Sequence, residues 1–161
     1  MHNESALEQN KYMQLQLEGD QLRFIASTGS GPAQSIHASV SRIRNALEQG
    51  KLTGARVEDA INQVEDLIMP ILRSLPASTE LRVSGLELVE IFHMLSATDN
   101  TVVPIASVES LFNQLADHAG GSPIAWHQAA SPAHVALGLV VLREVMHHGG
   151  FGSVSLMIDT E

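Results

Sequence analysis

Alternation of apolar and polar residues predicts β-strands near both ends of the chain. Residues 12–17 alternate with a period of two, residues 18–20 have the turn composition Glu-Gly-Asp, and residues 21–25 continue as a second strand. Residues 153–158 alternate in the same way. Because side chains point to opposite faces along a strand, each segment is expected to bury one face. The pattern therefore predicts an N-terminal β-hairpin and a C-terminal strand.

Apolar residues spaced three and four apart predict helices between these strands. The segments 35–49 and 57–75 each carry such a seam, and a short connection containing Gly50 and Gly54 separates them. Two helices joined by so short a connection pack side by side in opposite directions. The sequence therefore predicts an antiparallel αα-hairpin over residues 36–75.

Capping residues mark the helices of the second half. Residues 84–87 read Ser-Gly-Leu-Glu, which matches a capping box and predicts a helix over 86–95 after a short strand at 79–83. Ser107 is expected to cap another helix. Ser131 followed by proline predicts the start of a last helix that ends at Gly149, and its apolar residues point in every direction. We expect this last helix to be the central one.

Together these elements predict an α+β fold. The N-terminal hairpin and the C-terminal strand would share a mainly antiparallel sheet, packed against about five helices that include the αα-hairpin. The chain has 161 residues, a length that fits one domain. We expect residues 1–10, which are polar, to be a frayed N-terminus and residues 11–161 to form a single domain.

Composition excludes several classes of protein. The chain has no cysteine, which rules out disulfides, thiolate nucleophiles and cysteine-ligated metal centres. No apolar run approaches the roughly 20 residues of a membrane span, so membrane insertion is not expected. The polar N-terminus lacks the apolar core of a signal peptide. These features predict a cytoplasmic protein.

The net charge of −9 is unevenly distributed. From Val83 onward there is one basic residue, Arg143, against eight acidic ones. Nucleic-acid binding depends on lysine and arginine contacts to phosphates, and this half of the chain lacks them. We therefore expect no nucleic-acid partner, and either a protein partner or self-association.

Motifs for nucleotide binding and nucleophilic catalysis are incomplete. Residues 29–34 read Gly-Ser-Gly-Pro-Ala-Gln before a predicted helix, where an anion could bind at the helix start. They lack the third glycine of the dinucleotide motif, and no Gly-Lys-Ser/Thr follows. No complete Gly-x-Ser-x-Gly elbow occurs either. The sequence assigns no catalytic or cofactor-binding residue and predicts no cofactor.

Histidines in the second half provide an alternative. Imidazole nitrogens ligate zinc and other divalent ions, so the candidate metal ligands are His118, His127, His147 and His148. Their spacing matches no metal motif, and histidines in a last helical turn also complement the helix dipole. His93 and His134, within apolar helices, are interpreted as core or interface residues. A divalent metal therefore remains an alternative to the absence of a cofactor.

Two functions follow from these observations. The acidic surface, the incomplete catalytic motifs and the helical seams favour a small acidic protein-interaction module of adaptor, chaperone, inhibitor or immunity type, without catalysis. Self-association would use one side of the second helix, at Val57, Ile61, Val64 and Ile68. The alternative is a metal-binding protein or enzyme that uses the histidine-rich C-terminal half.

Overall fold

The fold is known from a computed structural model that describes residues 11–27, 31–95, 102–123, 126, 128 and 130–157. The segment 1–10, predicted to be frayed, lies outside these ranges. Within them, no helix is both long enough and apolar enough to cross a membrane.

Six strands of the described residues form one sheet, in the order β3-β2-β1-β4-β6-β5. Its strands are β1 (Tyr12–Glu18), β2 (Gln21–Ala26), β3 (Gln34–Ser39), β4 (Glu80–Ser84), β5 (Val102–Pro104) and β6 (Ser153–Leu156). The pairs β1–β2, β2–β3 and β5–β6 are antiparallel, whereas β1–β4 and β4–β6 are parallel.

The α+β class is confirmed, as are the N-terminal hairpin and the C-terminal strand in one sheet. The centre of the sheet is parallel because β1, β4 and β6 are joined by segments that contain helices. Such connections carry the chain back to the starting edge of the sheet, so that the next strand runs in the same direction. The result is a mixed sheet.

The predicted helix over residues 35–49 is wrong in its first part. Gln34–Ser39 forms strand β3, which pairs with β2 from Gln34 opposite Ala26 to Ser39 opposite Gln21. This segment also alternates, because Ile36 and Ala38 are half-buried while their neighbours are exposed. The apolar residues of this segment fit both a helix and a strand, and its pairing with β2 makes it a strand. The αα-hairpin therefore begins later, with α2 (Ser41–Glu48) followed by α3 (Gly54–Ser74).

Helix α6 (Pro132–Gly149) is the central helix, as predicted. It lies between α3 and α5 (Ile105–Ala119) and also contacts α2 and α4 (Leu86–Leu95).

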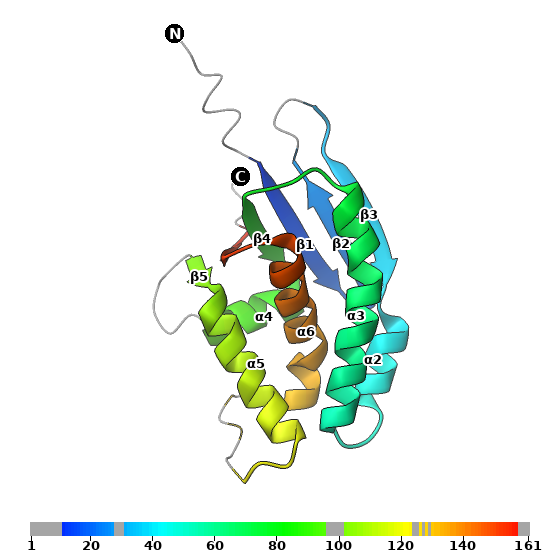
Figure 1. The fold of residues 1–161 in the computed structure, drawn as a ribbon, viewed down its shortest axis with the longest axis vertical. Coiled ribbons are helices and arrows are strands. Elements are labelled where there is room, and N and C mark those ends of the chain that lie inside the picture. The colour runs from blue at the N-terminus through cyan, green and yellow to red at the C-terminus, as the bar shows by residue number, and fades with distance from the viewer. Residues whose placement is uncertain are drawn as a thin grey trace.

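 In the view of Figure 1, α6 stands between α3 and α5. Its start and end are also as predicted, because the Ser131 side chain accepts a hydrogen bond from the backbone N–H of His134 and Gly150 ends the helix in the left-handed conformation.

The core lies between one face of the sheet and the helices. Alternate residues of β1 are buried, which gives the sheet an apolar face at Met13, Leu15 and Leu17. Helix α6 contributes apolar side chains around its whole circumference, and the other helices each contribute one buried side. The core therefore has α6 at its centre, enclosed by elements with one apolar face each.

Gly85, between β4 and α4, holds the end of β1 close to the start of α4. Its φ of +94° lies in the left-handed region, and a Cβ atom there would lie 2.2 Å from the carbonyl oxygen of Leu17. Only glycine avoids both the backbone strain and this contact. The close approach places Glu18 and Gly19 beside the first turn of α4.

We predict that Gly85→Ala destabilises the fold by roughly 2–5 kcal/mol, since it combines backbone strain with a collision against the main chain. Urea unfolding followed by circular dichroism measures this loss. Gly152→Ala is the matched control, because Gly152 has no neighbour within 4 Å of an added Cβ. Equal stability of the two variants would contradict the proposed role of Gly85.

Candidate functional site

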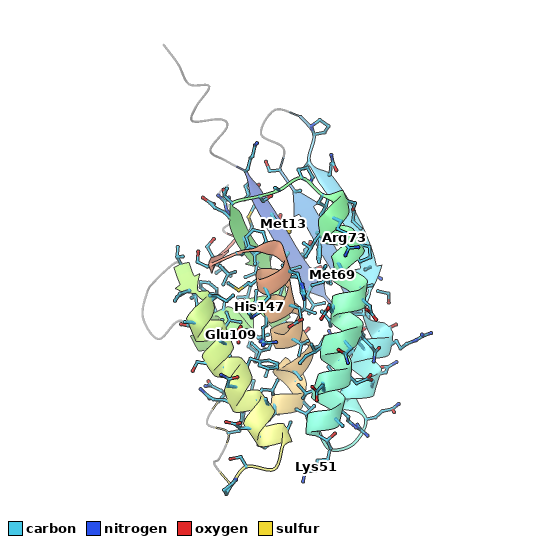
Figure 2. All side chains as sticks on the ribbon, viewed as in Figure 1. Met13, Lys51, Met69, Arg73, Glu109 and His147 are labelled. Atoms are coloured by element: carbon cyan, nitrogen blue, oxygen red, sulfur yellow. The ribbon has the colours of Figure 1, made fainter. Side chains whose placement is uncertain are left out.

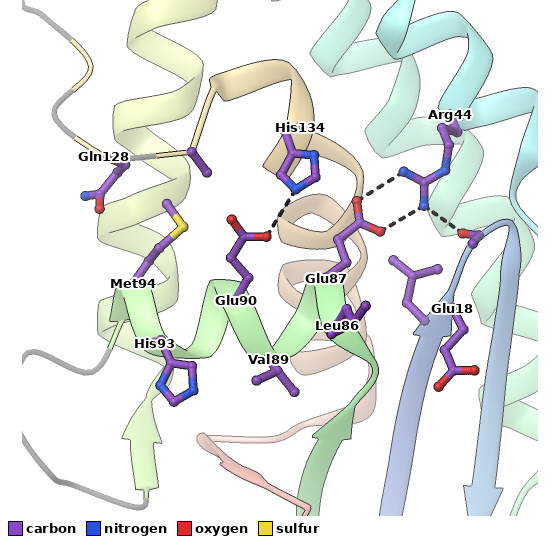
Figure 3. A pocket seen from close by; sticks show the side chains of 13 residues that line it. Glu18, Arg44, Leu86, Glu87, Val89, Glu90, His93, Met94, Gln128 and His134 are labelled. Carbon is purple, nitrogen blue, oxygen red and sulfur yellow. Dashed lines mark hydrogen bonds and ion pairs between the residues drawn. The ribbon is translucent and has the colours of Figure 1, made fainter.

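A pocket of about 1100 Å³ lies where β1 and β4 end and α4 begins (Figure 3). Because β1 and β4 are parallel, their carboxyl ends meet at the same edge of the sheet. Ligands of open α/β sheets commonly bind at this edge. The residues that line the pocket are Leu17, Glu18, Gly19, Arg44, Leu86, Glu87, Val89, Glu90, His93, Met94, Gln128, Ala130 and His134.

Arg44 on α2 and Glu87 on α4 form a two-pronged ion pair at one side of the pocket. The guanidinium donates hydrogen bonds of 3.1 and 2.8 Å to the two carboxylate oxygens of Glu87. It also donates to Asp20, at 2.9 Å, and to the carbonyl of Gly19, at 2.7 Å. The hydrogen bond with Glu87 is the main reason that the pKa of Arg44 is raised, so the guanidinium remains charged.

This pair replaces the predicted capping box. The α4 helix begins at Leu86 as expected, but Arg44 binds both carboxylate oxygens of Glu87. The hydroxyl of Ser84 accepts a hydrogen bond from the side chain of Gln14. The sequence pattern therefore located the helix correctly and assigned its two polar residues to the wrong partners.

Glu90 and His134 form a second pair on the pocket wall (Figure 3). Nε2 of His134 lies 3.1 Å from a carboxylate oxygen of Glu90, and both side chains are about half exposed. His93, one turn further along α4, is also exposed. The interpretation of His93 and His134 as core residues is therefore wrong, because both side chains are exposed, and an interface role stays a prediction.

The charge of the pocket is negative. Its lining has carboxylates at Glu18, Glu87 and Glu90 and one guanidinium, at Arg44, which Glu87 already neutralises. Carboxylate oxygens suit Mg²⁺ and similar hard cations. The pocket can therefore attract a cation more readily than a free anion.

A second polar cluster lies between α5 and α6, away from the pocket. His147 and Arg143 both contact the carboxylate of Glu109, the latter at 3.1 Å (Figure 2 labels Glu109 and His147). Burial alone would raise the pKa of Glu109, but the hydrogen bonds to His147 and Arg143 outweigh it and lower the pKa below its ordinary value. Glu109 is therefore held in its charged form.

The histidines predicted as metal ligands are not brought together as one group. His147 contacts Glu109, whereas His148 lies near Glu65 and Glu144. His118 is nine residues beyond Glu109 on α5, about 13 Å along the axis, and its ring lies near Trp126. His127 lies outside the described residues.

The predicted self-association residues face inward. Val57, Val64 and Ile68 are buried in the core of their own chain, and Ile61 is half-buried against it. A dimer that used these side chains would have to expose the core first.

The sequence did not identify the pocket, because its residues come from five separate segments. Arg44 and Glu87 are distant in the chain and meet only when α2 packs near α4. The anion site considered at residues 29–34 loses its basis in the described part of that segment, because Gln34 begins strand β3 where a helix start was expected. Glu87 is the pocket residue that a sequence pattern, the capping box at residues 84–87, indicates.

Comparison with known proteins identifies the fold. No family model matches the sequence, and no curated protein matches it. Solved structures do match. A PPX-GPPA enzyme from Aquifex aeolicus has a TM-score of 0.68 and 6% identity over 92% of this chain and 53% of its own. An exopolyphosphatase-like protein has a TM-score of 0.69 and 12% identity over 96% and 56% of the two chains.

An exopolyphosphatase from Cytophaga hutchinsonii matches similarly, with a TM-score of 0.63 and 13% identity over 92% of this chain and 53% of its own. The chain thus spans about half the length of these proteins and resembles one half of a Ppx/GppA-type enzyme. At such low identities the likeness shows the fold alone.

This likeness overturns the prediction of a non-catalytic protein-interaction module. The chain has the fold of one half of solved proteins named as a phosphatase and an exopolyphosphatase, and this likeness favours the alternative, a metal-binding protein or enzyme, over the interaction module. The prediction rested on the incompleteness of local motifs, which is a weak argument against a site. In this fold, polar residues gather from separate segments, so a site need not produce a local motif.

We predict that Arg44→Gln lowers the free energy of unfolding by about 2–4 kcal/mol, because it leaves the carboxylate of Glu87 without its cation in a largely buried position. Arg42→Gln is the matched control on the exposed side of the same helix. Urea unfolding of both variants provides the comparison. A loss no greater for Arg44→Gln than for Arg42→Gln would show that the pair does not stabilise the fold.

The lowered pKa of Glu109 predicts an acid-dependent loss of stability. Its contribution is fully present above the pKa of the unfolded chain, about 4.3, and is lost as the pH falls through the lower folded-state pKa. Glu109→Gln should therefore be less stable than the parent at pH 7 and should lose less on acidification below about pH 4.5. Glu58→Gln, an exposed change on α3, should follow the parent curve; identical curves for all three proteins would refute the prediction.

Proposed function

We propose that this chain is one lobe of a phosphatase-type enzyme that acts on a phosphoanhydride such as polyphosphate. The observation that carries the proposal is the position of the pocket, at the carboxyl ends of two parallel strands in a fold that resembles half of a Ppx/GppA-type enzyme. This edge is where such sheets bind ligands. The substrate class comes from the names of the matched proteins, which include exopolyphosphatases.

A divalent cation is part of the proposal, because the pocket is negative. A polyphosphate would be repelled by the carboxylates of Glu18 and Glu90 unless an ion lay between them. Mg²⁺ is typically held by one or two carboxylates together with substrate phosphates. Glu18 and Glu90 are the candidate ligands, because Gln16 and His134 each occupy only one of their carboxylate oxygens, whereas Arg44 binds both oxygens of Glu87.

The pair of Glu90 and His134 supplies a proton acceptor. When Nε2 of His134 carries the proton that Glu90 accepts, Nδ1 is free to take a proton from a water molecule. That water would attack the terminal phosphorus and form a new P–O bond while the bond to the bridging oxygen breaks. The products are inorganic phosphate and a chain shorter by one phosphate.

The matched proteins are about twice as long as this chain, so a second lobe is expected to close the pocket from the other side. We therefore choose ligand binding, which one lobe can show, as the primary test, with phosphate release measured in the same samples.

Binding of tripolyphosphate, followed by isothermal titration calorimetry, is predicted to require Mg²⁺. The double variant Glu18→Gln, Glu90→Gln should weaken it at least tenfold, because the cation loses its ligands. The control is Glu58→Gln, Asp59→Asn, which removes the same charge from an exposed side of α3. Binding that is independent of Mg²⁺, or equal in both double variants, would contradict the proposal.

A further inference from the structure

We propose that Glu65 on α3 and Glu144 and His148 on α6 form a binding site for a divalent ion of the zinc class. One ligand atom from each residue lies within 4.8 Å of the others. The site is separate from the pocket, since His134 and His148 are 14 residues, about 21 Å, apart along α6. It is therefore independent of the proposed function.

The distances fit a single ion. Nε2 of His148 lies 3.4 Å from Oε1 of Glu144 and 3.7 Å from Oε2 of Glu65. Zinc bonds to nitrogen and oxygen are about 2.0–2.2 Å, so two ligand atoms of one tetrahedral ion lie about 3.4 Å apart. The third ligand atom, from Glu65, lies within 4.8 Å of the other two, and its side chain is 45% exposed, so rotation toward the ion is open to it.

Glu144 provides an observation independent of the cluster itself. Its side chain is only 5% exposed, and a carboxylate at that depth needs compensation. Arg143 donates to Oε2 at 2.9 Å, while the other oxygen, Oε1, faces His148. One oxygen is thus satisfied and the other is directed at the proposed ion.

Arg143 is itself fixed in place. Its Nε donates to Glu109 at 3.1 Å, and its guanidinium lies 4.2 Å from the centre of the Phe112 ring. Residues that orient a metal ligand in this way strengthen metal binding. The Glu144 carboxylate is therefore oriented before an ion arrives.

The donor set decides the class of metal. The carboxylates of Glu65 and Glu144 bring two negative charges and the guanidinium of Arg143 brings one positive charge, so a cation would offset the remaining negative charge. Mg²⁺ and Ca²⁺ prefer oxygen ligands only, whereas zinc accepts imidazole together with carboxylate. Three protein ligands leave one position for water, on the side where His148 is exposed.

The test is titration of ZnCl₂ into chelator-treated protein without an affinity tag, by calorimetry. One ion per chain is expected, together with a rise in the unfolding midpoint of roughly 5 °C in excess zinc, because the ion binds the folded state. Glu65→Gln and His148→Ala should each weaken binding at least tenfold. Circular dichroism confirms that these surface variants fold.

Two controls locate the ion. His147→Ala removes the neighbouring imidazole, which contacts Glu109 instead, and should bind zinc as the parent does. The pocket variant Glu18→Gln, Glu90→Gln should also retain zinc, so failure of the proposed function would leave this result intact. No zinc binding at micromolar concentrations, or unchanged binding in Glu65→Gln and His148→Ala, would overturn the proposal.

Discussion

The structure depends on the burial of α6, a helix without a polar side. A helix that is apolar all round must be enclosed on every side, and here α2, α3, α4 and α5 contact it. Each of these helices needs only one apolar face. Because the middle of α6 is enclosed, its titratable side chains lie toward its ends, with His134 at its start and Glu144 and His148 near its end.

The two proposed sites use the same helix in different ways. At the start of α6, His134 and Glu90 are about half exposed and line a large pocket that a ligand can enter. Near its end, Glu144 is buried, and its charge is offset by Arg143. A rigid central helix suits both, because side chains on a well-packed element hold their positions.

Much of the fold was predictable from local signals. Period-two alternation located β1 and β2, and Ser131 with Gly149 and Gly150 bounded α6. Strand β3 was missed because its segment also continued a helical period, and only its pairing with β2 decides between the two. The candidate pocket could not be predicted, because Arg44, Glu87 and His134 are brought together by packing and share no local pattern.

The parallel pairing of β1 with β4 has a consequence for how the chain folds during synthesis. The hairpin β1–β2 and strand β3 can pair as soon as they leave the ribosome, but the other edge of β1 stays unpaired until β4 has been made. Helix α6 is made later still, after all the helices that enclose it. An N-terminal fragment would therefore expose the apolar faces of α2 to α5, and cooperative folding has to wait for nearly the whole chain.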